Sequence, residues 1–170
     1  MKLLLSILLL FSLSFSDDIY EADVTAEEAY EMQKKGEAII VDVRTPIEFI
    51  YIGHGEGFIN IPSFEWSYIP KKLSTRIKSA QFEIKNSKVK DHKSIMKLYK
   101  EKEKMNKKFI PEVMEAMKAN NVTKVILVCR SGPRSKASAN MLASNGIEAY
   151  NLEDGYIFGW KETELPQGGE

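Results

Sequence analysis

A single cysteine, Cys129, is the residue in this sequence best suited to nucleophilic chemistry. The thiolate is the reactive form of a cysteine, and positive charge or the N-terminus of a helix lowers a thiol pKa toward that form. An apolar, β-branched run from Thr123 to Val128 leads into Cys129, and Pro133 suits the first turn of a following helix. The pattern therefore predicts a cysteine on a loop between a buried strand and a helix.

Six residues follow Cys129 in this predicted loop and helix start: Arg130, Ser131, Gly132, Pro133, Arg134 and Ser135. Gly132 permits the tight curl that lets backbone N–H groups converge on the sulfur, although Pro133 removes one donor. Arg130 and Arg134 add two positive charges that attract an anion. We predict a thiolate in the resting protein. The alternative, a buried thiol at a strand end, would leave both arginines poorly placed.

Strands and helices alternate around this loop. The expected strands are 20–24, 38–43, 58–61, 123–128 and 148–152, and the expected helices are 25–35, 46–51, 109–117 and 133–145. Thr25 and Glu28 have the spacing of a capping box at the first helix. The alternation predicts an α/β fold with a central, mostly parallel sheet flanked by helices, and it places Cys129 where ligands bind in such sheets.

The length of 170 residues favours one domain, expected over 17–170. Residues 64–108 hold 14 Lys or Arg and 5 Asp or Glu, whereas the rest of the chain after residue 16 holds 9 and 19. The overall net charge of zero excludes a globally basic nucleic-acid binder. We interpret 64–121 as a Lys-rich helical insertion of two or three helices. It would dock an acidic protein partner or an anionic membrane surface, or form a solvated face.

The chain begins with Met1, Lys2 and an apolar run over 3–15 that is too short to span a bilayer comfortably. With small residues at Ser14 and Ser16, this arrangement predicts a secretory signal peptide over 1–16. We expect a periplasmic or secreted protein, with an uncleaved anchor as the alternative. One cysteine permits no disulfide within the chain, so Cys129 is expected to serve another purpose.

Three stretches resemble motifs of the rhodanese family of sulfurtransferases. The sequence VCRSGPRS over 128–135 resembles the family's active-site loop. DVRTPIEF over 42–49, continued through 53–62, resembles its N-terminal signature, and NLEDG over 151–155 with Trp160 resembles its C-terminal one. The three occur in the family's order and bracket nearly the whole chain after the predicted signal peptide.

The resemblance implies a rhodanese-like three-layer fold, with 64–121 as an insertion, and a reaction like that of thiosulfate sulfurtransferases. Cys129 would take sulfane sulfur from an anionic, thiosulfate-like donor, hold it as a persulfide and pass it to a thiol or cyanide-like acceptor. The loop amides would stabilise the persulfide. Asp42 and Arg44 would brace the loops in a supporting role. No metal or organic cofactor is implied beyond the covalent persulfide on Cys129.

Two other functions remain open. A phosphatase or arsenate reductase of the same fold resembles a pattern with five residues between cysteine and arginine, whereas four separate Cys129 from Arg134. A noncatalytic or redox binding module in the cell envelope would use the fold as a scaffold, which the intact cysteine and arginines disfavour. One histidine and three aromatic residues near the motifs are interpreted as structural or pocket-rim residues: His54, Trp66, Tyr68 and Trp160.

Overall fold

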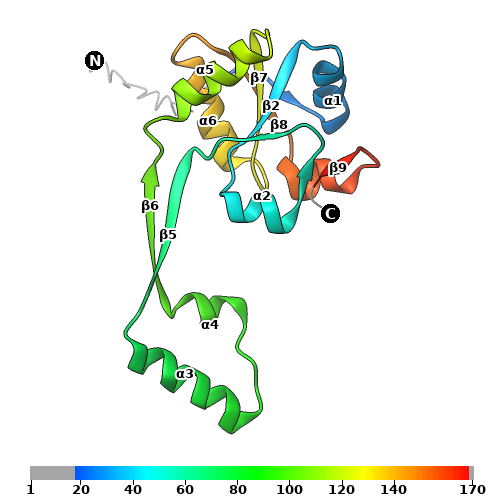
Figure 1. The fold of residues 1–170 in the computed structure, drawn as a ribbon. Helices are drawn as coiled ribbons and strands as arrows, with labels where there is room; N and C mark the ends of the chain where they lie inside the picture. The colour runs from blue at the N-terminus through cyan, green and yellow to red at the C-terminus, as the bar shows by residue number, and fades with distance from the viewer. Residues whose placement is uncertain (1–17, 169–170) are drawn as a thin grey trace, which may run out of the picture.

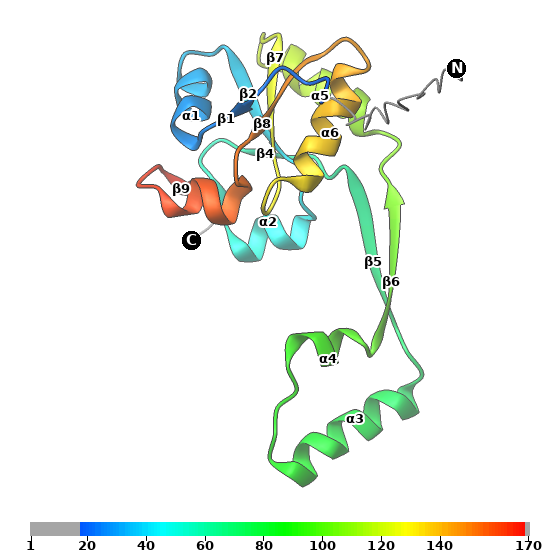
Figure 2. The same cartoon turned by 180° about the vertical axis from the view of Figure 1, so that it is seen from behind.

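The computed structural model describes residues 18–168, which form a five-stranded parallel sheet with helices on both faces (Figure 1, Figure 2). The strands are β1 (Asp23–Val24), β2 (Ala38–Asp42), β4 (Ile59–Asn60), β7 (Lys124–Val128) and β8 (Glu148–Leu152), in the order β1-β8-β7-β2-β4. The predicted α/β class with a central parallel sheet is confirmed. The predicted signal peptide over 1–16 lies outside the described residues.

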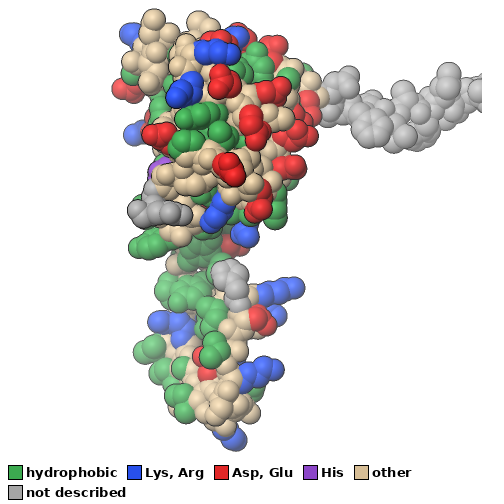
Figure 3. Space-filling view, turned by 90° about the vertical axis from the view of Figure 1, so that its right-hand side faces the viewer, with side chains coloured by type: hydrophobic (Ala, Val, Ile, Leu, Met, Phe, Trp, Pro, Cys, Tyr) green, Lys and Arg blue, Asp and Glu red, His purple; other side chains and the backbone are tan. Residues whose placement is uncertain are grey.

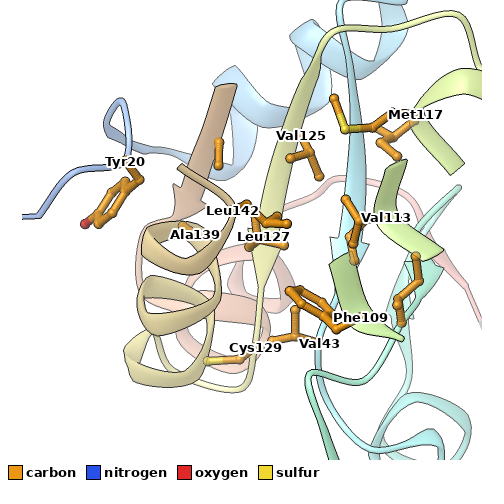
Figure 4. Packing of buried hydrophobic residues seen from close by; sticks show 14 residues of the cluster. Tyr20, Val43, Phe109, Val113, Met117, Val125, Leu127, Cys129, Ala139 and Leu142 are labelled. Carbon is orange, nitrogen blue, oxygen red and sulfur yellow. The ribbon is translucent and has the colours of Figure 1, made fainter. Parts of the chain in front are cut away.

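Two apolar cores lie on the two faces of this sheet, because successive strand residues point to opposite sides. On one face, α5 (Phe109–Ala119) and α6 (Pro133–Ala143) pack on the sheet in a cluster that includes Val41 and Leu127 (Figure 4). On the other face, α1 (Ala26–Lys34) joins a cluster that includes Ile40 and Ile126. The sheet is therefore buried on both faces, as its continuous apolar runs predict.

The alternation along β7 determines which core receives the reactive cysteine. Val125 and Leu127 belong to the core beneath α5 and α6, and Cys129, two residues further on, belongs to the same core. Figure 4 shows the Cys129 side chain at the end of this core, beside α6. The strand periodicity thus directs the side chain of Cys129 toward the face of the sheet that α6 covers.

Local sequence signals account for the ends of the helices near the sheet. The capping box predicted at Thr25 and Glu28 is present at the start of α1. A second capping box joins Thr45 and Glu48 at the start of α2 (Pro46–Ile52), which the sequence analysis did not single out. Each box satisfies two backbone N–H groups that would otherwise lack a partner at the helix N-terminus.

The end of the described chain closes over the face that carries α1. A π-helical turn, η1 (Gly155–Gly159), leads into a short 3₁₀ turn, η2 (Trp160–Glu162), and β9 (Gln167–Gly168) then pairs with β3 (His54–Gly55). Trp160 is fully buried and packs edge-on against Phe58, with ring centroids 4.6 Å apart. Among residues 18–168, no helix is long and apolar enough to cross a membrane.

The segment 64–121 differs from the expected all-helical insertion. It contains three helices, α3 (Leu73–Asn86), α4 (His92–Met96) and α5, but α3 and α4 stand at the end of an antiparallel ribbon of β5 (Phe64–Pro70) and β6 (Tyr99–Met105). We call residues 64–105 the arm and the remaining described residues the body. The arm projects away from the body in both ribbon views (Figure 1, Figure 2). The ribbon was missed because its alternating Lys and Glu are poor strand formers.

Candidate active site

The Cys129 sulfur lies in a cradle of hydrogen-bond donors at the carboxyl end of β7. The backbone N–H of Gly132 donates to Sγ at 3.2 Å, and the Ser135 hydroxyl oxygen lies 3.3 Å from Sγ. Gly132 has φ +107°, a conformation that favours glycine, and it lets the chain turn into α6 at Pro133. Cys129 is only 1% exposed, so the loop covers the sulfur on most sides.

Two opposing effects set the pKa of the Cys129 thiol. Burial raises the pKa, but hydrogen bonds from the Ser135 hydroxyl and from the N–H groups of Ser131, Ser135 and Gly132 outweigh burial and lower it. The Ser135 hydroxyl also lies 2.8 Å from the Gly132 carbonyl, and its one proton serves one acceptor at a time. The groups that lower the thiol pKa are therefore backbone amides, which the sequence analysis predicted, and the Ser135 hydroxyl.

The π-helical turn η1 holds the carbonyl side of the same loop. The N–H of Tyr156 donates to the Cys129 carbonyl at 2.7 Å, and the N–H of Ile157 donates to the Arg130 carbonyl at 3.0 Å. Gly155 has φ +63°, and a Cβ there would lie 2.6 Å from the Cys129 carbonyl oxygen. This close approach of two backbones explains why the motif over 151–155 ends in glycine.

Asp42 and Arg44 form a fully buried ion pair at the end of β2. Arg44 Nε and Nη2 donate to the Asp42 carboxylate at 2.6–3.0 Å, and Nη2 also donates to the Gly53 carbonyl at 2.8 Å. The guanidinium carbon lies 4.4 Å from the centre of the Tyr156 ring. Because Tyr156 in turn holds the Cys129 carbonyl, the pair supports the loop from one residue away rather than by direct contact.

The two loop arginines have different surroundings. Arg134 forms a two-point ion pair with Glu48, with Nη1 to Oε2 at 2.9 Å and Nη2 to Oε1 at 2.7 Å. Arg130 is exposed and forms no ion pair within residues 18–168. Glu48 balances the charge of Arg134, so the attraction of an anion by both arginines stays a prediction, with Arg130 as the arginine of the loop that lacks an ion pair in the described residues. The capping box at Thr45 was the sequence signal that could have drawn attention to Glu48.

A cleft of about 780 Å³ adjoins the cysteine loop on the side of the arm. Arg130, Arg134 and the first turn of α2 line one side of it. Phe64, Trp66 and Tyr68 of β5 also line it, which agrees with the interpretation of Trp66 and Tyr68 as pocket-rim residues. The site therefore combines a buried sulfur with an adjacent cleft, one wall of which belongs to the insertion.

The remaining predicted residues have structural surroundings. Ser131 contributes its backbone N–H, and Pro133 opens α6 without a donor, as the sequence predicts. The His54 ring stacks on Phe49 with ring centroids 3.7 Å apart and does not reach the loop. No group of three His, Cys, Asp or Glu residues in the part of the chain that the structure describes is arranged to hold a metal ion.

A strand-end cysteine in an amide-lined loop, on a parallel α/β sheet with helices on both faces, is the arrangement expected of a rhodanese-like domain. The rhodanese-like domain family matches residues 25–163, and the chain belongs to this family. The recognition made from the three sequence motifs is confirmed.

Comparisons with known proteins identify similar structures and a sequence relative. The chain is similar to the solved structure of Rv0390 from M. tuberculosis, with a TM-score of 0.55 and 20% identity over 89% of this chain and 99% of that one. A rhodanese-related protein from Thermoplasma volcanium is 21% identical over 88% of this chain and all of that chain, with a TM-score of 0.47. An uncharacterised protein of Rickettsia prowazekii, RP600, is 34% identical over 68 residues, 36% of this chain and 55% of that protein.

Replacing Ser135 by alanine should weaken the nucleophile. The Ser135→Ala variant loses the hydroxyl donor to Sγ, so the thiol pKa should rise by roughly one unit and the pH profile of alkylation by iodoacetamide should shift to higher pH by the same amount, since a hydrogen bond to a charged group is worth about 1.5 kcal/mol or more. The measurement is the pH profile of the alkylation rate. Ser138→Ala is the matched control, because that hydroxyl donates to the Arg134 carbonyl instead. An unshifted profile for Ser135→Ala would contradict the assignment.

The Glu48–Arg134 pair should make the free energy of unfolding depend on pH in the acidic range. Burial raises the pKa of Glu48, but Arg134 and the Thr45 bonds prevail and lower it from 4.5 to about 2. A depressed carboxyl pKa stabilises the fold above about pH 4.5, and this contribution disappears as the pH falls toward 2. Glu48→Gln should thus lower the free energy of unfolding by about 1–3 kcal/mol at pH 7 and by little near pH 2.

Urea unfolding of the wild type and the Glu48→Gln variant across this pH range measures the effect. Glu27→Gln serves as the control, because Glu27 is exposed in the first turn of α1. A difference between wild type and Glu48→Gln that stays constant from pH 7 to pH 2 would disprove the role of this charge.

Proposed function

We propose that this protein is a sulfurtransferase that carries sulfane sulfur as a persulfide on Cys129. The observation that supports the proposal most directly is the cradle of amide and hydroxyl donors around one strand-end cysteine. Such donors stabilise a thiolate before the reaction and the negative charge on the outer sulfur of a persulfide after it. Membership in the rhodanese-like domain family supports the same chemistry.

The reaction would proceed in two displacement steps. In the first, the Cys129 thiolate attacks the sulfane sulfur of a thiosulfate-like donor, a new sulfur–sulfur bond forms, and the donor's bond breaks to release sulfite with its electron pair. In the second, a thiol or cyanide-like acceptor attacks the outer sulfur, and the Cys129 thiolate leaves with the bonding electrons. No net oxidant or reductant is consumed. Neither step calls for a metal or an organic cofactor.

We also place this chemistry outside the cytoplasm. The support is the basic start, the apolar run over 3–15 and the small residues at Ser14 and Ser16, which together have the features of a secretory signal. An exported sulfur carrier with one cysteine has no second thiol in its own chain with which to form a disulfide. The noncatalytic or redox module remains the competing function, and the next experiment separates the two.

Intact-protein mass spectrometry tests the proposal. After incubation with thiosulfate, the wild type should gain the mass of one sulfur atom, cyanide should remove it, and thiocyanate should appear in the supernatant. Cys129→Ser should gain nothing, and Ser138→Ala should behave as the wild type. If no sulfane donor, inorganic or organic, produces a cyanide-labile adduct, the sulfurtransferase proposal fails and the binding module is favoured.

A further inference from the structure

The cleft beside the cysteine loop has a wall that the insertion supplies. Phe64, Trp66 and Tyr68 alternate with more polar residues along β5, so all three point to one face of the ribbon. They line the cleft opposite Arg130 and Pro46. Aromatic rings provide large, rigid contact area for an apolar group.

The same ribbon face carries two glutamates, and the opposite face carries three lysines and Glu65, which pairs with Lys104. Glu103 lies directly opposite Trp66 in the β5–β6 ladder, and Glu101 lies opposite Tyr68. The intervening residues of β6 are Lys100, Lys102 and Lys104, which belong to the other face. The ribbon therefore turns aromatic rings and carboxylates toward the cleft and its ammonium groups away from it.

The charges of the cleft do not suit a small dianion such as thiosulfate. Arg134 is neutralised by Glu48, which leaves Arg130 as the cleft-lining cation without an ion pair in the described part of the chain. Glu103 also lines the cleft and forms no ion pair within residues 18–168. A second negative charge on a ligand would lie near this carboxylate, whereas an apolar group would contact the three rings. The cleft thus favours one negative charge joined to an apolar body.

We propose that the cleft selects an organic sulfane-sulfur donor, in which a singly charged sulfur group enters beside Arg130 and an aromatic or apolar body packs against Trp66 and Tyr68. This inference rests on the sulfurtransferase function proposed above and specifies its substrate class. For a thiosulfonate donor, the Cys129 thiolate attacks the terminal sulfur, the sulfur–sulfur bond of the donor breaks, and the sulfinate leaves with the electron pair. Cys129 keeps the transferred sulfur as a persulfide.

Two donors with the same charge and reacting group test the proposal. Benzenethiosulfonate and methanethiosulfonate differ in the phenyl and methyl groups, and their rates with glutathione correct for intrinsic reactivity. The corrected rate of Cys129 persulfidation should be roughly tenfold higher with the phenyl donor, because aromatic contacts and apolar burial both favour the phenyl group. Trp66→Ala should remove most of this preference, because it should slow the phenyl donor more than the methyl donor. Phe82→Ala, on α3 and outside the cleft lining, should change neither rate.

A second variant keeps the test independent of folding defects in Trp66→Ala. Glu103→Gln removes the carboxylate from an exposed position, so it should increase the thiosulfate rate severalfold relative to benzenethiosulfonate. Equal corrected rates for the two organic donors, with persulfide formed from both, would overturn the substrate class and leave the sulfurtransferase function standing. Absence of persulfide with every donor would instead refute the function itself.

A separate observation concerns the far end of the arm. Leu73, Ile77 and Ile84 of α3 are 61%, 46% and 79% exposed, and their spacing places them on one side of the helix. The other side carries the buried Ser79, whose hydroxyl is hydrogen-bonded by Lys90. In Figure 3, hydrophobic and basic side chains gather on the arm, while acidic side chains gather on the body.

We infer that α3 docks on an anionic lipid surface through this apolar stripe. Residues 64–108 carry 14 Lys or Arg and 5 Asp or Glu, so the surface complementary to this stripe and its surroundings is both apolar and negatively charged. A second copy of the chain is a poorer partner for the stripe. Its own stripe would offer apolar contact, but the basic residues of the two copies would repel each other. Anionic lipid provides both acyl chains and negative headgroups.

Hydrogen–deuterium exchange of the full chain with vesicles tests this inference at the level of α3. Residues 73–86 should gain protection with phosphatidylglycerol vesicles and not with phosphatidylcholine vesicles. Leu73→Ser combined with Ile84→Ser should abolish the gain, whereas Ile50→Ser, an equally exposed apolar residue of the body, should preserve it. Unchanged exchange with anionic vesicles, or protection that instead rises with protein concentration in the absence of lipid, would overturn the lipid surface.

Discussion

The buried ion pair between Asp42 and Arg44 is the interaction on which the site's architecture depends. An unpaired charge in this interior would cost several kcal/mol, so the two groups must stay together. Arg44 also binds the Gly53 carbonyl and lies over the Tyr156 ring, and Tyr156 holds the Cys129 carbonyl. The Nη1 atom of Arg44 has no hydrogen-bond acceptor among the described residues. Contact of the guanidinium with the face of the Tyr156 ring offsets part of this loss. One guanidinium thus links β2, the end of α2 and the turn that fixes the cysteine loop.

The loop stabilises negative sulfur with neutral dipoles rather than with formal charges. Backbone N–H groups and one hydroxyl point at Sγ, and they are held in place by the helix on one side and by η1 on the other. In the proposed reaction, dipoles fixed in this way would need little reorganisation when charge moves to the outer sulfur of a persulfide. Arg134 would have supplied charge at the same loop, but its pairing with Glu48 makes it a brace between α6 and α2.

Local signals in the sequence predict the body well and the arm poorly. Buried β-branched runs, the Thr25 capping box and the position of Cys129 after an apolar strand each follow from neighbouring residues, and the structure has them. The Glu48–Arg134 pair joins residues 86 positions apart, so periodicity could not reveal it. Gly155 is a second feature that periodicity could not reveal. A side chain is excluded there because the backbone of another segment, at Cys129, lies too close. The ribbon was missed because Lys and Glu in alternation are also typical of a solvated helix.

That same alternation gives the ribbon its distinct faces. A strand with period two sends the carboxylates of β6 to the side of Trp66 and Tyr68 and the ammonium groups to the opposite side. A helix with this composition would have mixed the charges around its surface. Strand geometry therefore converts an insertion with a large net positive charge into one that presents rings and carboxylates to the cysteine loop. The three lysines of β6 are thus directed away from the cleft, and a resemblance in the loop motif alone would not determine which donor reaches Cys129.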